Sequence, residues 1–249
     1  MKHIFRGLSA KPLPFDYQIR RSQRAKKTRI VVTGAKIEVV APPQVAERKI
    51  HDFVYAQRDW ISAAVEKMQR HRQGIAKLAP ASYGDGAKIP FKGDYFPLII
   101  KPSALRRIKI EFAEENGFIA HSPDSTVAGH SELIRVALIK WMKEQARAEG
   151  HRYIKLHADK HRLTPRSLRI KTQKSRWGSC GVNNDINLNW LLIIAPPSVM
   201  EYVVVHELCH IRHRNHSRDF WELVADHLPD YRQRRGWLKQ HGQSLMLGL

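Results

Sequence analysis

The chain has 249 residues, of which 43% are hydrophobic and 27% charged, enough to bury a core in one large domain or two small ones. It contains no run of about 18 uncharged apolar residues, which excludes a membrane-spanning helix, and its two cysteines are too few for a disulfide scaffold. The net charge of +20 attracts polyanions such as nucleic acid, although basic residues spread along the whole chain also suit a solvated surface.

Residues 1–17 lack the apolar segment of a secretory signal peptide, because lysine, arginine and proline interrupt them. A basic organelle-targeting segment is the alternative, but the two prolines and the missing amphipathic period argue against it. We therefore expect a cytoplasmic protein with no membrane partner. In that compartment Cys180 and Cys209 are interpreted as small buried hydrophobic side chains.

The first 110 residues predict a β-rich region with one long helix. Residues 28–41 alternate in polarity and turn at Thr33-Gly34, as a β-hairpin does, and a proline pair then ends the strand. Apolar residues recur at helical spacing over 44–72, and a linker rich in glycine, proline and alanine follows at 74–90. Further strands are predicted at 92–101 and 106–122, with a turn at Glu115-Asn116-Gly117.

Residues 111–249 are predicted to form the second, catalytic region. A long helix is expected over 131–161, with an apolar stripe that begins at Ile134 and includes Leu138 and Met142. Strands are predicted at 167–172 and 186–195. Two more helices are expected at 198–214 and 217–228, the second of which ends before Pro229.

Residues 206–216 read HELCHIRHRNH and concentrate four histidines around one carboxylate. A helix turns about 100° per residue, so His206 and His210 share a face about 6 Å apart along the axis and both rings can reach one ion. Glu207 lies about 100° round from His206, which suits a general base that holds a water molecule on the metal. Two imidazoles and a third ligand leave one position open on Zn²⁺, as catalysis requires.

The third ligand is predicted to be His216. His213 falls on the same helical face but lies too far along the axis, whereas His216 reaches the ion if the chain turns back. Asn215 suits that turn, because asparagine tolerates the left-handed conformation found at helix ends, and Ser217 can cap the next helix. The alternatives are a carboxylate from that helix, Glu222 or Asp226, and His213 itself.

The sequence of residues 203–242 closely resembles the YgjP-like metallopeptidases, relatives of the SprT-like zincins, in which HELxH is followed by NHS and an aromatic pair. Residues 174–180 (KSRWGSC) and 186–204 fit the same pattern. The resemblance implies that the histidine of NHS, here His216, completes the site. It also implies an α+β fold with a zincin-like catalytic half, in which a mixed sheet packs on a backing helix near 131–158 and the HExxH helix lies beneath the cleft.

The same resemblance implies that the strand at 176–180 lines the cleft and can bind an extended peptide through its main chain. Trp177 would give apolar contact and Gly178 would let a backbone approach; the alternative is a core tryptophan and a turn glycine. A donor for the developing oxyanion is also needed, and Arg176, Tyr231 and His213 are the candidates. The alternative for Tyr231 is a purely structural role with no contact to the oxyanion.

These residues predict zinc-dependent hydrolysis of a peptide or protein, with Glu207 passing a proton from water to the leaving amine. Three alternatives remain. A zinc-dependent phosphoanhydride (nucleotide) hydrolase suits so basic a chain, although it has no glycine-rich phosphate loop. A DNA-associated protease suits the charge and the SprT-like kinship. A non-catalytic zinc module would not need Glu207. The sequence does not predict the oligomeric state.

Overall fold

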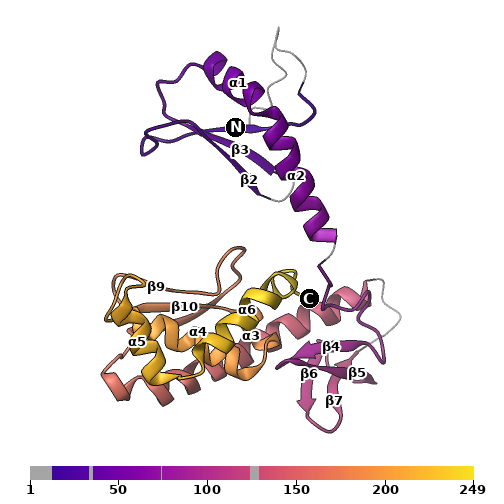
Figure 1. The fold of residues 1–249 in the computed structure, drawn as a ribbon. Helices are drawn as coiled ribbons and strands as arrows, with labels where there is room; N and C mark the ends of the chain where they lie inside the picture. The colour runs from indigo at the N-terminus through magenta and orange to yellow at the C-terminus, as the bar shows by residue number, and fades with distance from the viewer. Residues whose placement is uncertain (1–12, 34–35, 74, 124–128) are drawn as a thin grey trace. The chain divides into compact units, whose positions relative to one another are not determined.

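The computed structural model describes residues 13–33, 36–73, 75–123 and 129–249. Contacts divide the chain into two compact units, 1–76 and 77–249 (Figure 1). The predicted α+β class is confirmed, because the described residues form mixed sheets and six α-helices. None of the described helices has the length and apolar content needed to cross a bilayer.

The N-terminal unit is a three-stranded sheet followed by two helices. Its elements are β1 (Gln18–Arg21), β2 (Arg29–Thr33), β3 (Lys36–Ala41), α1 (Glu47–Ala56) and α2 (Arg58–Gln73). Antiparallel pairing of β2 with β3 confirms the predicted hairpin, although residues 34–35 of its turn lie outside the described residues. The sheet order is β1-β3-β2, with β1 parallel to β3, and the sequence analysis did not foresee β1.

The single helix predicted over 44–72 is divided in two at Gln57. At this break the Arg58 guanidinium donates to the carbonyl of Tyr55 at 3.1 Å. The apolar faces of both helices still contribute to one core. Its fully buried members are Ile37, Val39, Ala41, Ile50, Val54 and Ile61.

The C-terminal unit begins with a four-stranded sheet of order β4-β5-β7-β6. Its strands are β4 (Lys88–Phe91), β5 (Asp94–Pro102), β6 (Lys109–Ala113) and β7 (Gly117–Ser122). The turn predicted before Gly117 is confirmed, with Gly117 at φ +78°. Strand β4 pairs with β5, and β5 pairs with β7 beyond residue 110. The compact units divide after residue 76, whereas the sequence predicts a regional boundary at 110.

Helix α3 (His130–His157) confirms the second long helix and links two sheets. In its first half, Trp141 packs on Phe91 and Phe118, with ring centroids 5.3 Å from each. Further along, the close approach of Gly150 to Leu168 and Leu188 brings the helix against the next sheet. A short 3₁₀ helix, η1 (Asp159–His161), follows α3.

The second sheet of this unit has the order β8-β10-β9 and carries the strand nearest the histidines. Its strands are β8 (Ser167–Lys171), β9 (Gly178–Cys180) and β10 (Asp185–Asn189). β8 is parallel and β9 antiparallel to β10, so the sheet is mixed and β9 lies at its edge.

The strand predicted over 186–195 is wrong in its second half. Residues Trp190–Ile194 form a buried 3₁₀ helix, η2, which begins where the side chain of Asn189 accepts a hydrogen bond from the backbone of Leu191. A short apolar run is buried equally well as strand or helix, so its composition did not distinguish the two.

Three further helices complete the unit: α4 (Pro197–Cys209), α5 (Arg218–His227) and α6 (Tyr231–Met246). Helix α4 is buried along most of its length and packs against α3. The predicted cap of α5 is confirmed, since Ser217 Oγ accepts from the backbone N–H of Phe220 at 3.4 Å. Helix α6 was not foreseen. A mixed sheet, the backing helix α3 and the HExxH helix α4 form the expected zincin-like half.

Candidate active site

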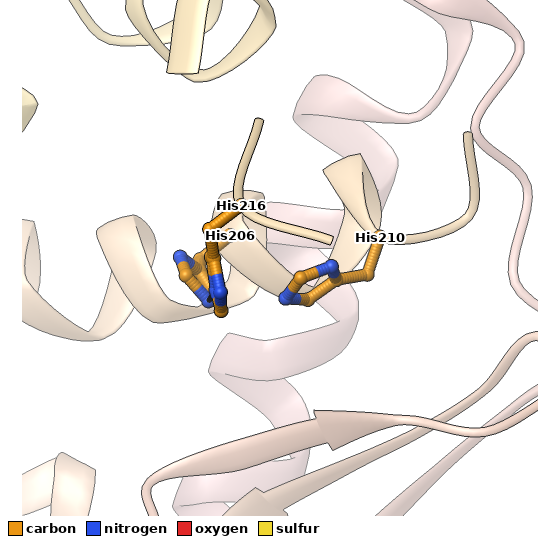
Figure 2. Close-up of side chains that lie close together, drawn as sticks. All are labelled: His206, His210 and His216. Carbon is orange, nitrogen blue, oxygen red and sulfur yellow. Dashed lines mark hydrogen bonds between the residues drawn. The ribbon is translucent and has the colours of Figure 1, made fainter. Parts of the chain in front are cut away.

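Three histidines from the end of α4 and the following loop converge. His206 lies in the last turn of α4, His210 directly follows it, and His216 precedes α5. One ligand nitrogen from each residue lies within 4.8 Å of the others. Figure 2 shows the His206 and His216 rings together, with the His210 ring pointing toward them, and Nε2 of His206 is 3.1 Å from Nε2 of His216.

The spacing of these rings and the lowered pKa values of His206 and His210 fit a zinc ion. Zinc binds nitrogen at roughly 2.0–2.1 Å, so two ligands of a tetrahedral site lie about 3.3 Å apart, close to the observed spacing of the His206 and His216 nitrogens. Burial, reinforced by the neighbouring His210 and His216, lowers the pKa of His206 to about 3. Burial also lowers the pKa of His210. Neutral imidazoles are the form that coordinates a metal.

The ring of His210 is held in one orientation. Its Nδ1 donates to the carbonyl of His213 at 2.9 Å, which leaves Nε2 free to bind an ion. The opposite face stacks on Phe220, with centroids 4.6 Å apart and planes at 29°. His213 therefore contributes through its backbone. By contrast, Nδ1 of His206 is buried and has no partner among the described residues.

The chain turns back toward His216 without the left-handed residue expected at Asn215. Among the described residues other than glycine, only Lys92, Arg162 and Asn184 have positive φ, so that expectation is wrong. Helix α4 ends at Cys209, and the backbone N–H of His213 bonds to the carbonyl of Cys209 at 3.0 Å. This bond and the bond from the His210 ring both fix His213 beside the end of the helix.

The ring of His216 belongs to a stack of aromatic side chains. It lies on Trp221, with centroids 5.6 Å apart and planes at 22°, and Trp221 lies on Tyr231 at 5.4 Å and 17°. Tyr231 is buried, and its hydroxyl accepts from Arg232. Tyr231 therefore lies behind Trp221. This position suits a structural role for Tyr231, the alternative to a role as oxyanion donor.

The carboxylates considered as alternative third ligands are engaged elsewhere. Glu222 pairs with Arg218 on the exposed side of α5. Asp226 pairs with Lys160 and His161. Neither joins the group of ligand atoms formed by the described residues.

Glu207 is buried beside the three histidines and touches the edge strand. Only 5% of the residue is exposed, and the backbone N–H of Cys180 in β9 donates to its carboxylate. A Cβ atom on Gly178 would lie 2.5 Å from Oε1 of Glu207, so this approach of β9 requires glycine. Burial raises the pKa of Glu207 to about 8, against the opposing effects of Arg176 and the Cys180 N–H.

A cavity of about 340 Å³ opens beside His206 and Glu207. It brings predicted residues from β9 and α4 together with residues of α6 that the sequence analysis did not single out. The lining residues are Trp177, Gly178, Tyr202, Val203, His206, Glu207, Arg235, Leu238 and Lys239. Arg176 acts on Glu207 through its charge and is not in this lining. In the sequence, only the run of basic residues in α6 hints that this helix contributes Arg235 and Lys239 to the cavity.

Two positioning residues also escaped the sequence analysis. Asn189 is fully buried, and its Nδ2 donates to the carbonyls of Gln173 (2.9 Å) and Arg176 (3.3 Å), which holds the segment leading into β9. Arg214 donates to the carbonyls of Gly181 (2.8 Å) and Val182 (3.3 Å). It thereby ties the loop that carries His216 to the turn after β9.

Both cysteines are free thiols.

Comparison with curated proteins finds no match. Comparison with protein families matches residues 26–241 to the YgjP-like family, described as YgjP-like, metallopeptidase domain. The matched span reaches into both compact units and contains the three histidines and Glu207. This match confirms the resemblance noted in the sequence. The chain therefore belongs to the YgjP-like family and carries its metallopeptidase domain.

Proposed function

We propose that the protein is a zinc-dependent peptidase in which His206, His210 and His216 hold the metal and Glu207 carries the proton. The observation behind this proposal is the convergence of three imidazoles beside one buried carboxylate. Bound zinc would supply Lewis acidity, polarising a carbonyl group and acidifying water.

The protein's own contribution begins with the position of Glu207. The Cys180 N–H fixes its carboxylate next to the His206 ligand and the cavity, where it can accept a proton from water and deliver it to a leaving amine. Trp177 and Val203 add apolar surface to the wall beside this transfer.

The edge strand β9 supports a peptide as the substrate. It pairs with β10 on one side, and no described strand pairs with its other side. An extended peptide can add to such an edge through main-chain hydrogen bonds. Gly178, which already contacts Glu207, would bring that peptide to the site of proton transfer. Trp177 and Arg176, which directly precede Gly178, are proposed to contact the substrate as well.

Substitution Glu207→Gln tests the proposal. The variant should retain about one equivalent of zinc, because the three imidazoles are unchanged, and lose about 10²–10⁴-fold or more of its turnover of a casein-like protein. Metal analysis and product detection by mass spectrometry provide the two measurements. The exposed, ion-paired Glu222→Gln on α5 is the matched control and should behave as wild type. Undiminished hydrolysis by Glu207→Gln contradicts the assigned role.

A second candidate, zinc-dependent hydrolysis of a nucleotide phosphoanhydride, is favoured by one observation. Arg235 and Lys239 line the cavity and could bind phosphate oxygens. Incubation of the zinc-loaded protein with a nucleoside triphosphate, in parallel with the protein substrate, separates the two functions. Release of phosphate or pyrophosphate without peptide cleavage would select the nucleotide.

A further inference from the structure

Helix α6 places two cations in the wall of the cavity beside Glu207. Arg235 and Lys239 are four residues apart, so they project from the same face of the helix, and both line the cavity. The only carboxylate in the lining is that of Glu207. The cavity therefore combines a reactive end, at His206 and Glu207, with a cationic side.

Neither of these cations is neutralised by an acidic side chain of the described residues. The neighbouring Arg234 differs: it pairs with both Glu201 and Asp230. Helix α6 thus forms ion pairs where they serve the fold, and leaves Arg235 and Lys239 available at the cavity. Arg235 is also held in place, with its guanidinium carbon 4.7 Å from the centre of the Trp221 ring.

Much of the remaining wall is apolar. Trp177, Leu238 and Val203 line it. Trp177 is braced by α6, since a Cβ atom on Gly242 would lie 3.2 Å from its ring. The volume of the cavity, about 340 Å³, falls within the range of cavities that hold small ligands. The best occupant is a short aliphatic stem that ends in an anion.

We propose that this cavity is a specificity pocket for a carboxylate of the peptide substrate, which Arg235 and Lys239 bind. The proposal rests on the peptidase function given above. A carboxylate matches the planar donor fork of arginine, and an amide in the same place would leave both cations uncompensated. The carboxylate comes either from an Asp or Glu side chain near the scissile bond or from a free C-terminus.

Paired peptides test the proposal and separate those two sources. One set carries Glu or Gln at each successive position and has amidated ends, and a second set has Gln throughout with a free or an amidated C-terminus. The zinc-loaded wild type should cleave carboxylate-bearing peptides with a kcat/KM at least about tenfold above that of their neutral partners. Faster cleavage of the Glu peptides in the first set would identify a side chain as the source of the carboxylate. Faster cleavage of the peptide with a free end in the second set would identify the C-terminus. Equal cleavage of all pairs overturns the proposal.

Variants assign the preference to the pocket. In Arg235→Gln and Lys239→Gln the ratio of kcat/KM between paired peptides should fall toward one, and in the double variant the preference should disappear. Arg232→Gln is the matched control, because Arg232 belongs to the same helix but not to the cavity lining, and its ratio should equal that of wild type. A ratio that survives the double variant overturns the proposal.

Binding to Glu207→Gln distinguishes failure of this proposal from failure of the peptidase function. Calorimetry should show tighter binding of the carboxylate-bearing peptide, and Arg235→Gln should remove that advantage. Such binding without any hydrolysis by wild type would refute the peptidase function and leave the pocket intact. Hydrolysis without selective binding would refute the pocket alone. Arg235-dependent binding of a nucleoside triphosphate more tightly than any peptide would overturn the carboxylate in favour of phosphate.

Discussion

Single residues set the position of the Glu207 carboxylate, and Gly178 is the most sensitive of them. Replacement by alanine would put a methyl group 2.5 Å from Oε1 of Glu207, so that either the carboxylate or the edge strand must shift. A displacement of about 1 Å costs of the order of 10²-fold in rate. We expect Gly178→Ala to lose about that much kcat/KM and to keep its zinc.

Gly181→Ala provides the matched control for Gly178→Ala. A methyl group on Gly181 would meet its nearest atom, the carbonyl oxygen of Asp185, at 3.6 Å, which is ordinary van der Waals contact. Its kcat/KM and zinc content should therefore stay close to wild type. A loss of equal size in both variants would contradict the specific clash at Glu207.

His227 predicts a dependence of stability on pH away from the candidate metal site. Both its ring nitrogens are buried without a hydrogen-bond partner among the described residues. Burial lowers its pKa to about 4; the nearby His161, His157 and Lys160 add to this effect, and Asp226 opposes it. In the unfolded chain the pKa of the His227 imidazole is near 6.5. Between about pH 4 and pH 6.5 the unfolded chain therefore binds a proton at His227 that the folded protein does not.

The stability that His227 contributes is thus complete above about pH 6.5 and is lost as the pH falls toward 4. His227→Phe keeps a ring in place and removes the titration. Lowering the pH from 7.5 to 5 should therefore destabilise wild type more than the variant. We expect the unfolding free energy of the variant, relative to that of wild type, to rise by roughly 2 kcal/mol over this change. Urea denaturation at the two pH values measures it, and a difference that does not change with pH contradicts the assignment.

At the scale of elements, the loop between α4 and α5 must hold His216 against the two histidines of α4. Arg214 fastens this loop to the turn after β9 through the carbonyls of Gly181 and Val182. Loss of such outer contacts typically lowers metal affinity 10–100-fold. We expect Arg214→Gln to weaken zinc binding by about tenfold, as measured by competition with a chelator, with little change in unfolding free energy.

The neighbouring Arg212 supplies the comparison for Arg214. It belongs to the same loop, but its guanidinium donates to the carbonyl of His161 and not to the turn after β9. Arg212→Gln should therefore retain zinc affinity. Equal loss in the two variants would mean that charge near the site, and not the tie between loop and strand, controls affinity.

Several elements followed from local sequence alone. The hairpin of β2 and β3, the long helix α3 and the Ser217 cap of α5 each depend on periodicity or on a neighbouring residue, and each was predicted. The sequence predicts a strand where Trp190–Ile194 form a 3₁₀ helix, because a fully apolar run shows neither the period of a strand nor that of a helix. The turn before His216 also differs from the prediction, since it is held by a bond between the His210 ring and the carbonyl of His213 and Asn215 is not left-handed.

At the scale of the whole molecule, the net charge of +20 predicts attraction to nucleic acid. We expect the protein to bind double-stranded DNA at 50 mM salt and to lose about 10³-fold or more of that affinity by 200 mM, as for a protein with six or more phosphate contacts. Fluorescence anisotropy with two unrelated duplexes tests both the salt slope and the absence of sequence preference. Binding that is insensitive to salt, or absent at 50 mM, contradicts this expectation.

The sequence by itself determined the reactive groups: a helix with His206 and His210 one turn apart, Glu207 beside them, and His216 ten residues after the first. These relations are local, and helical geometry converts spacing directly into position. Only the tertiary structure decided what surrounds them. The contact of Gly178 with Glu207, the tie of Arg214 and the cations of α6 join segments distant in the chain, and such contacts arise from packing in one core and leave no period in the sequence.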